Sequence, residues 1–325
     1  MAHVIARAPR VLILRRDNIG DLVCTTPLIA ALRRQLPHAW LAALVNTYNA
    51  EVLSGNSALD EVFVFEKLKH RTGSLLSHLR SRLAQRSDLR GRRLDAVLVP
   101  APTPQALKHA RSLGAGRIIA APEIANERQH EVERTFEVGR ALGLAGAPGP
   151  LEIFADASRR AELAAQLGAG PFVAIHISAR RPAQRWPWER YAALARELAR
   201  ARRVMLLWAP GARDDPRHPG DDEGARAVAA LAPSPNVLPV PTPDLRTLIA
   251  ALSLAERVVC PDGGAMHLAA GLGKPVIALF GDSPVARWRP WGVPHRVVQP
   301  ESANLADLPL APVLEAASGE LPPRS

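Results

Sequence analysis

Residues 11–37 read VLILRRDNIGDLVCTTPLIAALRRQLP. The apolar run at residues 11–14 predicts a short, buried parallel strand, and the polar segment at residues 15–20 predicts a turn that ends in glycine. Asp21 then begins a helical pattern that stops at Pro37. The residues on one face of this helix are Leu22, Thr25, Ile29, Leu32 and Leu36. The stretch therefore predicts the strand-and-helix unit from which α/β sheets are built.

The same alternation continues along the chain in two series. Further strand-like apolar runs lie at residues 41–45, 62–65, 94–99, 117–120, 172–177, 204–208, 237–240, 257–260 and 275–280. Helices are expected at residues 188–202, 244–252 and 266–272. The segment GLAGAPGP at residues 143–150 has the composition of a linker. We therefore predict two doubly wound, Rossmann-like domains, residues 1–150 and 151–325, that face each other across a ligand-binding cleft.

Length and composition agree with this organisation. The chain has 325 residues, too many for one compact core, and 47% of them are apolar. No apolar stretch approaches the roughly 18 residues of a membrane span, and residues 1–10 lack the apolar run of a secretory signal. The two cysteines, Cys24 and Cys260, lie far apart and indicate no disulfide framework. We expect a cytoplasmic protein.

The formal net charge of +10 raises the question of nucleic-acid binding. Only four of the 41 basic residues are lysines, and arginine, alanine and proline are abundant, as a GC-rich coding bias would produce. The chain has no aromatic stacking platform and no recognised nucleic-acid motif, so we expect no nucleic-acid partner. Such a charge still attracts nucleotides, anionic phospholipids and phosphorylated glycolipids.

Glycine patterns argue against two common enzyme classes. No Gly-x-Gly-x-x-Gly follows the first strand of either half, and the sequence has no P-loop Gly-Lys-Ser/Thr. A nicotinamide-dependent enzyme or a P-loop enzyme is therefore disfavoured.

The first group of residues with chemical potential is Gly20-Asp21. Gly20 permits a close backbone approach at the turn after the first strand. A carboxylate from Asp21 at the carboxyl edge of that strand could accept a proton from an attacking hydroxyl. The alternative is that Asp21 only caps the helix that it begins.

The second group follows the first strand of the second half, in IHISARRPAQRWPW at residues 175–188. The hydroxyl of Ser178 can donate to a phosphate oxygen, and Arg180, Arg181 and Arg185 offer charge to a diphosphate. The alternative is a surface loop whose tryptophans pack as hydrophobic anchors.

The third group is CPDGGAMHLAA at residues 260–270, where a strand ends and a helix begins. The backbone amides of Gly263, Gly264 and Ala265 can hold an anion at the helix N-terminus. His267 lies one turn beyond Gly263 and should point near the same place, although a lone histidine is usually structural.

In this order, Gly20-Asp21 with Thr26-Pro27, Arg185-Trp186-Pro187, Asp262-x-Gly264-x-x-His267 and Phe280-Gly281 resemble the signature positions of glycosyltransferase family 9, which contains the lipopolysaccharide heptosyltransferases. The resemblance implies a GT-B fold with an N-terminal acceptor domain and a C-terminal donor domain, and sugar transfer with inversion and without a metal. It implies Asp21 as the base. The donor-site positions that it implies are Ser178, Arg185, Asp262, Gly264 and His267, and we add Gly263 for its backbone amide. The chain departs from the family pattern at Gly263, where a hydroxyl residue is common, and at Arg185, where lysine is common.

The expected reaction moves a sugar, in first place a heptose, from a nucleoside-diphosphate sugar such as ADP-heptose to a lipopolysaccharide-core-type glycolipid. The nucleotide sugar is a co-substrate, and we expect no cofactor. We expect a monomer at the cytoplasmic face of the inner membrane. A GT-B-shaped sugar-nucleotide epimerase or hydrolase is the enzyme alternative, and a basic binding protein is the non-enzymatic one.

An acidic loop at residues 211–223 contains Asp214, Asp215, His218, Asp221 and Asp222. These groups could hold Mg²⁺ or Mn²⁺. The alternative, which we favour, is a solvated loop with proline and glycine as turn formers. We therefore predict no metal site.

A basic stretch at residues 67–93 contains nine lysines and arginines against one acid, Asp88. Helical spacing of Leu75, Leu76, Leu79 and Leu83 predicts a helix that buries these leucines and exposes its arginines. We expect Arg82, Arg86 and Arg90 to dock on a phosphorylated glycolipid and on the anionic inner leaflet. The alternative is an ordinary solvated face.

Overall fold

The computed structural model describes residues 7–65, 75–122, 128–168, 170–215 and 219–323, and only the backbone of residues 75–78. The chain divides into two compact units, Met1–Gly149 and Pro150–Ser325, here called the N-terminal and C-terminal units. The division falls within the GLAGAPGP segment. Gly143, the first residue of this segment, has a φ of 109° and ends helix α5 (Glu131–Leu142). A positive φ at the end of a helix is the conformation that glycine adopts most readily.

The N-terminal unit is built on a five-stranded sheet in the order β3-β2-β1-β4-β5. Its strands are β1 (Arg10–Leu14), β2 (Trp40–Asn46), β3 (Glu61–Phe65), β4 (Ala96–Val99) and β5 (Arg117–Ala120). Each pair of neighbouring strands is parallel. The order changes direction between β1 and β4, which is the position where doubly wound sheets bind ligands at their carboxyl edge.

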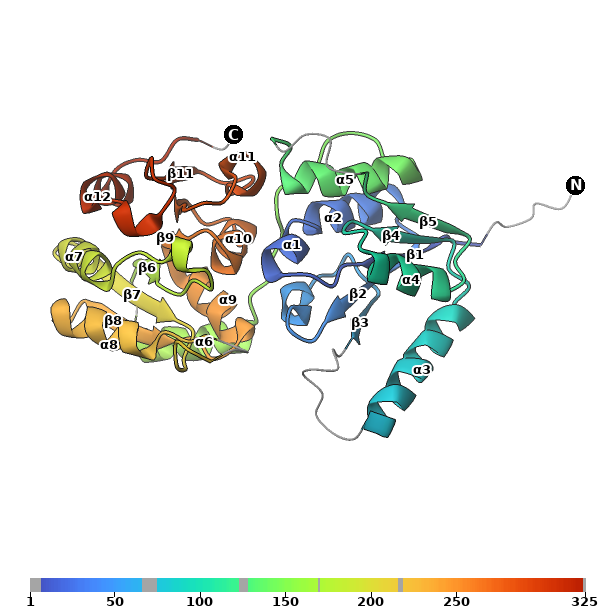
Figure 1. Ribbon diagram of the computed structural model, residues 1–325, viewed down its shortest axis with the longest axis horizontal. Coiled ribbons are helices and arrows are strands. Elements are labelled where there is room, and N and C mark those ends of the chain that lie inside the picture. Colours follow the sequence, from blue (N-terminus) through green and yellow to red (C-terminus); the bar gives the residue numbers. More distant parts are fainter. Residues whose placement is uncertain (1–6, 66–74, 123–127, 169, 216–218, 324–325) are drawn as a thin grey trace, which may run out of the picture. The chain divides into compact units, whose positions relative to one another are not determined.

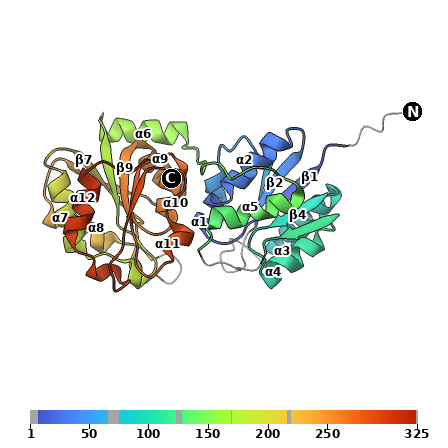
Figure 2. The ribbon, with the colours of Figure 1, turned by 90° about the horizontal axis from the view of Figure 1, so that it is seen from above.

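Helices cover both faces of this sheet. Helices α3 (Leu75–Gly91) and α4 (Pro104–Ser112) lie on one face, and α2 (Thr26–Gln35) and α5 on the other (Figures 1 and 2). Leu12 and Leu14 belong to the apolar core under α3 and α4. Because alternate side chains of a strand point to opposite faces, Arg15 and Arg16 just beyond β1 should also diverge.

The C-terminal unit contains a six-stranded sheet in the order β11-β10-β9-β6-β7-β8, again with parallel neighbours. Its strands are β6 (Phe172–His176), β7 (Arg203–Trp208), β8 (Val237–Pro241), β9 (Ala255–Pro261), β10 (Val276–Leu279) and β11 (His295–Val298). Its helices are α6 (Ala157–Leu167), α7 (Trp188–Leu198), α8 (Asp222–Leu231), α9 (Leu245–Leu254), α10 (Gly264–Gly271), α11 (Val285–Trp288) and α12 (Leu310–Ser318). The direction of the order changes between β6 and β9.

The prediction of two doubly wound α/β halves is confirmed. One local prediction is wrong, because the single helix expected from Asp21 is two helices, α1 (Ile19–Val23) and α2. Pro27 lacks the N–H that would continue a helix from α1. The hydroxyls of Thr25 and Thr26 also donate to the backbone carbonyls of Asp21 and Val23, which belong to α1. Asp21 is therefore the third residue of α1, after the capping residue Asn18.

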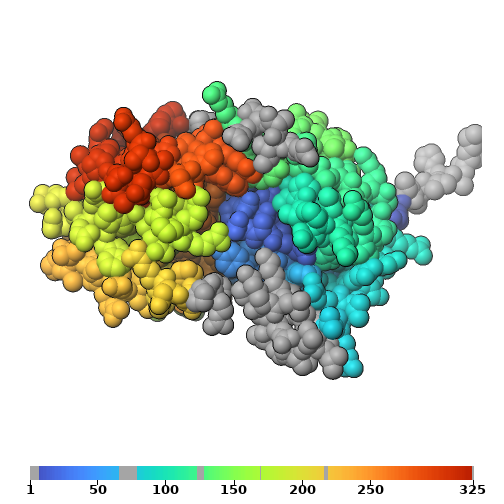
Figure 3. Space-filling view, viewed as in Figure 1, coloured from blue at the N-terminus to red at the C-terminus, as the bar shows by residue number. Residues whose placement is uncertain are grey.

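Helix α3 forms as expected, but its leucines are not buried as predicted. Leu79 is 44% exposed and Leu83 is 63% exposed, whereas Leu89 near the end of the helix is fully buried. The side chains of Leu75 and Leu76 lie outside the described residues. The atoms of α3 (cyan in Figure 3) stand at the surface of the N-terminal unit. The helix therefore packs on the sheet through its C-terminal part and exposes leucines together with arginines.

Candidate functional site

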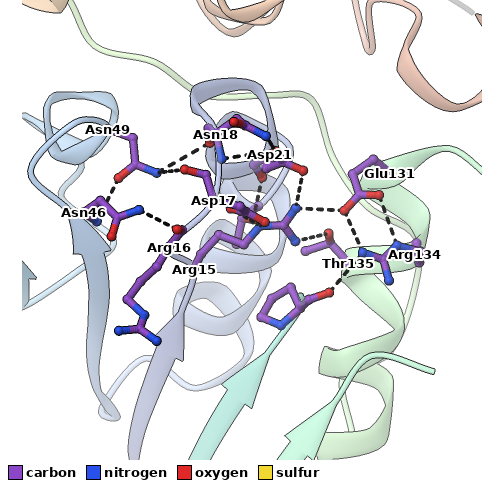
Figure 4. A network of polar contacts seen from close by, with 12 residues as sticks. Arg15, Arg16, Asp17, Asn18, Asp21, Asn46, Asn49, Glu131, Arg134 and Thr135 are labelled. Atoms are coloured by element: carbon purple, nitrogen blue, oxygen red, sulfur yellow. Dashed lines mark hydrogen bonds and ion pairs between the residues drawn. The ribbon is translucent and has the colours of Figure 1, made fainter. Parts of the chain in front are cut away.

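A buried arginine organises the carboxyl edge of the N-terminal sheet. Arg15 follows β1 directly, and its side chain is 1% exposed. Its Nη2 donates to Asp21 Oδ1 at 2.9 Å and to Glu131 Oε1 at 2.8 Å, and its Nε donates to Asp17 Oδ1 at 3.0 Å. Its Nη1 donates to the hydroxyl of Thr135 at 3.4 Å. Figure 4 shows these groups converging from β1, α1 and α5.

The carboxylate of Asp21 is held at both oxygens. Oδ1 accepts from Arg15, while Oδ2 accepts from the backbone N–H of Asn18 at 3.2 Å and from its amide Nδ2 at 2.9 Å. Asp21 thus contributes to capping α1, as the capping alternative expected. It also belongs to the Arg15 cluster, which consists of Arg15, Asp17, Asp21, Glu131 and Thr135. Each carboxylate oxygen has about two acceptor sites, so Oδ1, with one donor from Arg15, retains one for a proton. The side chain is 14% exposed.

A second arginine, Arg134, holds Glu131 in the cluster. Glu131 is fully buried and accepts from Arg134 Nε at 3.1 Å and Nη2 at 3.0 Å. Arg134 Nη2 also donates to the carbonyl of Pro100, the residue after β4. Burial favours the neutral form of Glu131, but the hydrogen bonds and charges of Arg134 and Arg15 outweigh it and lower its pKa to about 2. Glu131 is therefore a permanent anion between two arginines.

Charge in the cluster is distributed unevenly. Burial opposes the charge of Arg15, yet the carboxylates of Asp17, Asp21 and Glu131 leave its pKa above the usual value. Asp17 differs from Glu131, because burial and the nearby charge of Asp21 outweigh Arg15 and raise its pKa to about 6. The pKa of Asp17 thus lies well above that of Glu131 in the same cluster.

In the C-terminal unit, the predicted residues follow β6 and β9, the adjacent strands at the change of direction. Ser178 Oγ accepts from the backbone N–H of Ala209 at 2.9 Å. Arg185 Nε donates to the carbonyl of Ala179 at 3.0 Å, which closes the loop after β6 on itself. Trp186 is buried and donates to the carbonyl of Leu308 at 2.8 Å. The tryptophan is therefore an anchor, and the arginine beside it is half-buried in the same loop.

Asp262 connects this loop to the turn after β9. Its Oδ2 accepts from Gln184 Nε2 at 2.9 Å, and the same amide nitrogen lies 3.1 Å from the hydroxyl of Ser283. Burial raises the pKa of Asp262, and hydrogen bonds from Ser283 and Gln184 partly offset the rise. Asp262 therefore fixes the loop that carries Arg185.

Gly263 and Gly264 start helix α10. Gly263 has a φ of 155°, and a Cβ placed there would meet nothing within 4 Å. The first amides of a helix have no partner within the helix, so the N–H groups at residues 264 and 265 are available for an anion. His267, one turn further, is 2% exposed, and its ring meets that of Trp288 edge to face at 6.0 Å. His267 is thus packed beside this turn.

Gly281 explains the Phe280-Gly281 motif. A Cβ at Gly281 would overlap the carbonyl oxygen of Ala183, in the loop after β6. Only a residue without a side chain allows that loop to pack against the end of β10. All of the predicted donor residues lie just beyond β6 or β9, at one edge of the C-terminal sheet. They are Ser178, Arg185, Asp262, Gly263, Gly264 and His267.

The acidic loop is largely used for internal contacts. Asp222 accepts from the indole N–H of Trp208 at 2.8 Å and from the backbone N–H of Gly211 at 3.1 Å. Burial raises the pKa of Asp221, and hydrogen bonding with Ser178 partly offsets this. Within the part of the chain that the structure describes, no three His, Cys, Asp or Glu residues are grouped as a metal site. His218 lies outside that part.

Several residues at these sites have no separate signal in the sequence. Asp17, Glu131, Arg134 and Gln184 were not predicted. Glu131 and Arg134 lie three positions apart at the start of a helix, a spacing typical of an ordinary surface ion pair. Only the fold shows that Arg15, 116 residues earlier, completes the group.

A model of the family described as "Glycosyltransferase family 9 (heptosyltransferase)" matches residues 105–309, well over half of the chain. This chain belongs to glycosyltransferase family 9. The resemblance seen in the sequence is thereby confirmed. This protein is a glycosyltransferase. The matched region includes the edge of the C-terminal sheet described above and begins after the stretch that contains Asp21.

Individual relatives match nearly the whole length of this chain. Lipopolysaccharide heptosyltransferase 1 of Escherichia coli (strain K12) is 25% identical over 330 residues, which cover 95% of this chain and 99% of that protein. Among solved structures, a family 9 glycosyl transferase from Veillonella parvula DSM 2008 has a TM-score of 0.82 at 20% identity, covering 97% of this chain and 98% of that one. E. coli heptosyltransferase WaaC with ADP has a TM-score of 0.74 at 21% identity, covering 94% and 97%. These similarities confirm the GT-B class of fold.

The helices of this family 9 glycosyltransferase are short or carry polar side chains. Among the described residues, none is both long enough and apolar enough to cross a bilayer.

Proposed function

We propose that this family 9 glycosyltransferase transfers heptose from ADP-heptose to a lipopolysaccharide-core-type glycolipid, with inversion at the anomeric carbon and without a metal ion. The observation that carries the proposal is the turn at residues 262–264, fixed by Gln184 and Ser283 beside the arginine loop after β6. The name of the E. coli relative supports the acceptor class, and ADP in the WaaC structure supports the nucleotide.

The C-terminal unit would bind the donor. The amides at the start of α10 and the guanidinium of Arg185 can receive the diphosphate as it becomes the leaving group. Positive groups at these positions make Mg²⁺ unnecessary for stabilising the leaving charge. His267, packed beside the turn, would line the same site.

The N-terminal unit would bind the acceptor and supply the base. The acceptor oxygen attacks the anomeric carbon while its proton passes to Asp21 Oδ1, which retains an open acceptor position. The bond from the anomeric carbon to the diphosphate oxygen breaks, and ADP leaves with the electron pair. Arg15 and Asn18 fix the orientation of the carboxylate, so that little reorganisation is needed during proton transfer.

Helix α3 would bring the enzyme to its lipid-linked acceptor on the cytoplasmic face of the inner membrane. Arg86 and Arg90 are exposed, and the exposed Leu79 and Leu83 add apolar surface to the same helix. Basic residues near an anionic leaflet contribute about 1 kcal/mol each. Lys67, Lys69 and Arg71 of the basic stretch lie outside the described residues.

The test is a transfer assay with ADP-heptose and a heptose-free lipopolysaccharide core, in the presence of EDTA. We expect stoichiometric ADP release and a product of inverted anomeric configuration by NMR. Release of free heptose or of an epimer without acceptor would identify the hydrolase or epimerase alternative. Transfer from another nucleotide sugar in preference to ADP-heptose would refute the donor assignment alone.

A further inference from the structure

The neighbours Arg15 and Arg16 serve opposite faces of the N-terminal sheet. Figure 4 shows their guanidinium groups pointing away from each other, as the alternation along β1 requires. Arg15 forms ion pairs with Asp17, Asp21 and Glu131. No described carboxylate forms an ion pair with Arg16, so its charge is not compensated in the same way.

Arg16 belongs to a group of cations around one aromatic ring. Its Cζ lies 4.3 Å from the ring centroid of Phe65, the last residue of β3. Arg82 of α3 places its Cζ 4.2 Å from the same centroid, and the ring of His109 of α4 lies 5.4 Å away. We call Arg16, Phe65, Arg82 and His109 the Phe65 cluster. Attraction to the ring favours each guanidinium individually, whereas the two guanidiniums repel each other.

The electrostatics of the Phe65 cluster show that an anion would be favourable there. Arg16 Nε is buried and has no hydrogen-bond partner. Burial and the charge of Arg82 lower the pKa of Arg16. Burial and the charges of Arg16, Arg82 and Arg86 lower the pKa of His109 to about 4, so its ring is neutral at pH 7. A buried donor without an acceptor is rare in folded proteins, and a bound ion is one way in which such a donor is satisfied.

We propose that the Phe65 cluster binds a phosphate group, held by the guanidinium groups of Arg16 and Arg82. A guanidinium presents two parallel N–H donors that match the oxygens of a phosphate. A phosphate dianion would balance both arginines and supply the acceptor that Arg16 Nε lacks. That this phosphate belongs to the glycolipid acceptor rests on the proposed function, but the phosphate site itself does not.

Titration with inorganic phosphate tests the site without turnover. The Cε1–H resonance of His109, assigned by its absence in His109→Gln, reports occupancy locally, and saturating ADP is present to occupy the proposed diphosphate site. We expect phosphate to shift this resonance in the wild type. In Arg16→Gln and Arg82→Gln the midpoint should rise at least about tenfold, because a charge-assisted bond is lost. Arg80→Gln, an exposed change on the same helix, should match the wild type.

Two outcomes would overturn the site. One is an unchanged midpoint in Arg16→Gln and Arg82→Gln, and the other is an equal rise in Arg80→Gln. Melting temperatures serve as a folding check, since removing an uncompensated cation should leave them equal to the wild type or higher. If the midpoint in Arg16→Gln is unchanged, a melting temperature that is lower in Arg16→Gln but not in Arg16→Lys would show that Arg16 has a structural role instead.

Two further measurements identify the source of the phosphate. Arg16→Gln should raise the KM for a phosphorylated acceptor, leave the KM for its dephosphorylated form and for the donor unchanged, and bind phosphatidylglycerol vesicles like the wild type. Weaker vesicle binding with unchanged KM values would assign the site to a lipid headgroup and refute the acceptor source. Failure of the wild type to transfer sugar would refute the proposed function, while the phosphate titration would still test the site.

Discussion

Arg15 donates a hydrogen bond of 2.9 Å to Asp21 from a guanidinium that is almost completely buried. The same nitrogen donates to Glu131, which Arg134 in turn holds from α5. A chain of charged groups therefore connects Asp21, the proposed base, to helix α5 near the end of the N-terminal unit's sequence. The orientation of Asp21 depends on packing as well as on its own helix.

The first prediction concerns Asp21 itself. Asp21→Asn keeps the shape of the side chain and an acceptor for Asn18, but it removes the basic oxygen. The kcat should fall about 10²–10⁴-fold, the usual contribution of a positioned base. Donor affinity should change little, whereas the melting temperature should fall, because Arg15 then keeps ion pairs only with Asp17 and Glu131. A kcat within threefold of the wild type would leave Asp21 with a capping role only.

The second prediction separates positioning of Asp21 from simple stability. Arg15→Lys keeps the charge, but a single ammonium cannot reach Asp17, Asp21 and Glu131 at once. Breaking this buried network should reduce the free energy of unfolding by about 3–5 kcal/mol. Misplacement of the base should lower kcat by up to about 10²-fold, with the donor KM unchanged.

Arg134→Lys is the matched control for this variant. Arg134 holds Glu131 as Arg15 does, but its hydrogen bonds go to Glu131 and Pro100 and not to Asp21. It should lose comparable stability and retain most of its kcat. Equal losses of kcat in the two variants, measured on folded protein, would mean that Arg15 acts through stability alone.

The third prediction follows from the raised pKa of Asp17. With a pKa of about 6 in the folded chain and 3.8 otherwise, Asp17 binds its proton more tightly when folded. The free energy of unfolding therefore falls as pH rises from about 4 to 6, and the full penalty is present at neutral pH. Asp17→Asn should remove it, which stabilises the protein at pH 7.5 by about 1–3 kcal/mol.

Denaturant unfolding at several pH values measures this effect. The advantage of Asp17→Asn should shrink below pH 6 and vanish near pH 4. A variant that is less stable than the wild type at pH 7.5 would show instead that the ion pair with Arg15 outweighs the burial of Asp17.

Some elements of the fold follow from sequence patterns alone. Strands that are buried on both faces are continuous apolar runs, so those at residues 11–14 and 172–177 could be placed closely. Helical spacing indicates which residues share a face, as in α3, but not whether that face is buried, and so Leu79 and Leu83 were misjudged. The Arg15 cluster joins side chains 116 residues apart, which no local pattern relates.

The fourth prediction concerns the donor site. Arg185→Ala should weaken ADP binding by roughly 1.5–3 kcal/mol, the range for a lost charge-assisted bond, as measured by calorimetry. His267→Ala should also weaken it, and His267→Gln should do so with a smaller loss of packing against Trp288. EDTA should leave both binding and activity unchanged.

Arg181→Ala is the control from the same loop. Arg181 is exposed and already paired with Asp282 at 2.9 Å, so its loss should affect ADP binding less than the loss of Arg185. An absolute requirement for added Mg²⁺ would contradict the metal-free site and return attention to the acidic loop at residues 211–223.

The fifth prediction concerns helix α3. Replacing Arg86 and Arg90 with glutamine should weaken sedimentation with anionic vesicles and raise the KM for a membrane-borne acceptor, with the donor KM unchanged. Binding should also disappear at high salt, because the Debye length falls from about 10 Å at 0.1 M to about 3 Å at 1 M.

Since Leu79 and Leu83 are exposed beside these arginines, their replacement with serine should weaken binding further and make the remainder more sensitive to salt. The matched control is Arg111→Gln on α4, an exposed charge on another element. If the arginine double variant sediments like the wild type at 0.1 M salt, α3 is an ordinary solvated helix, and the enzyme reaches its acceptor through another surface.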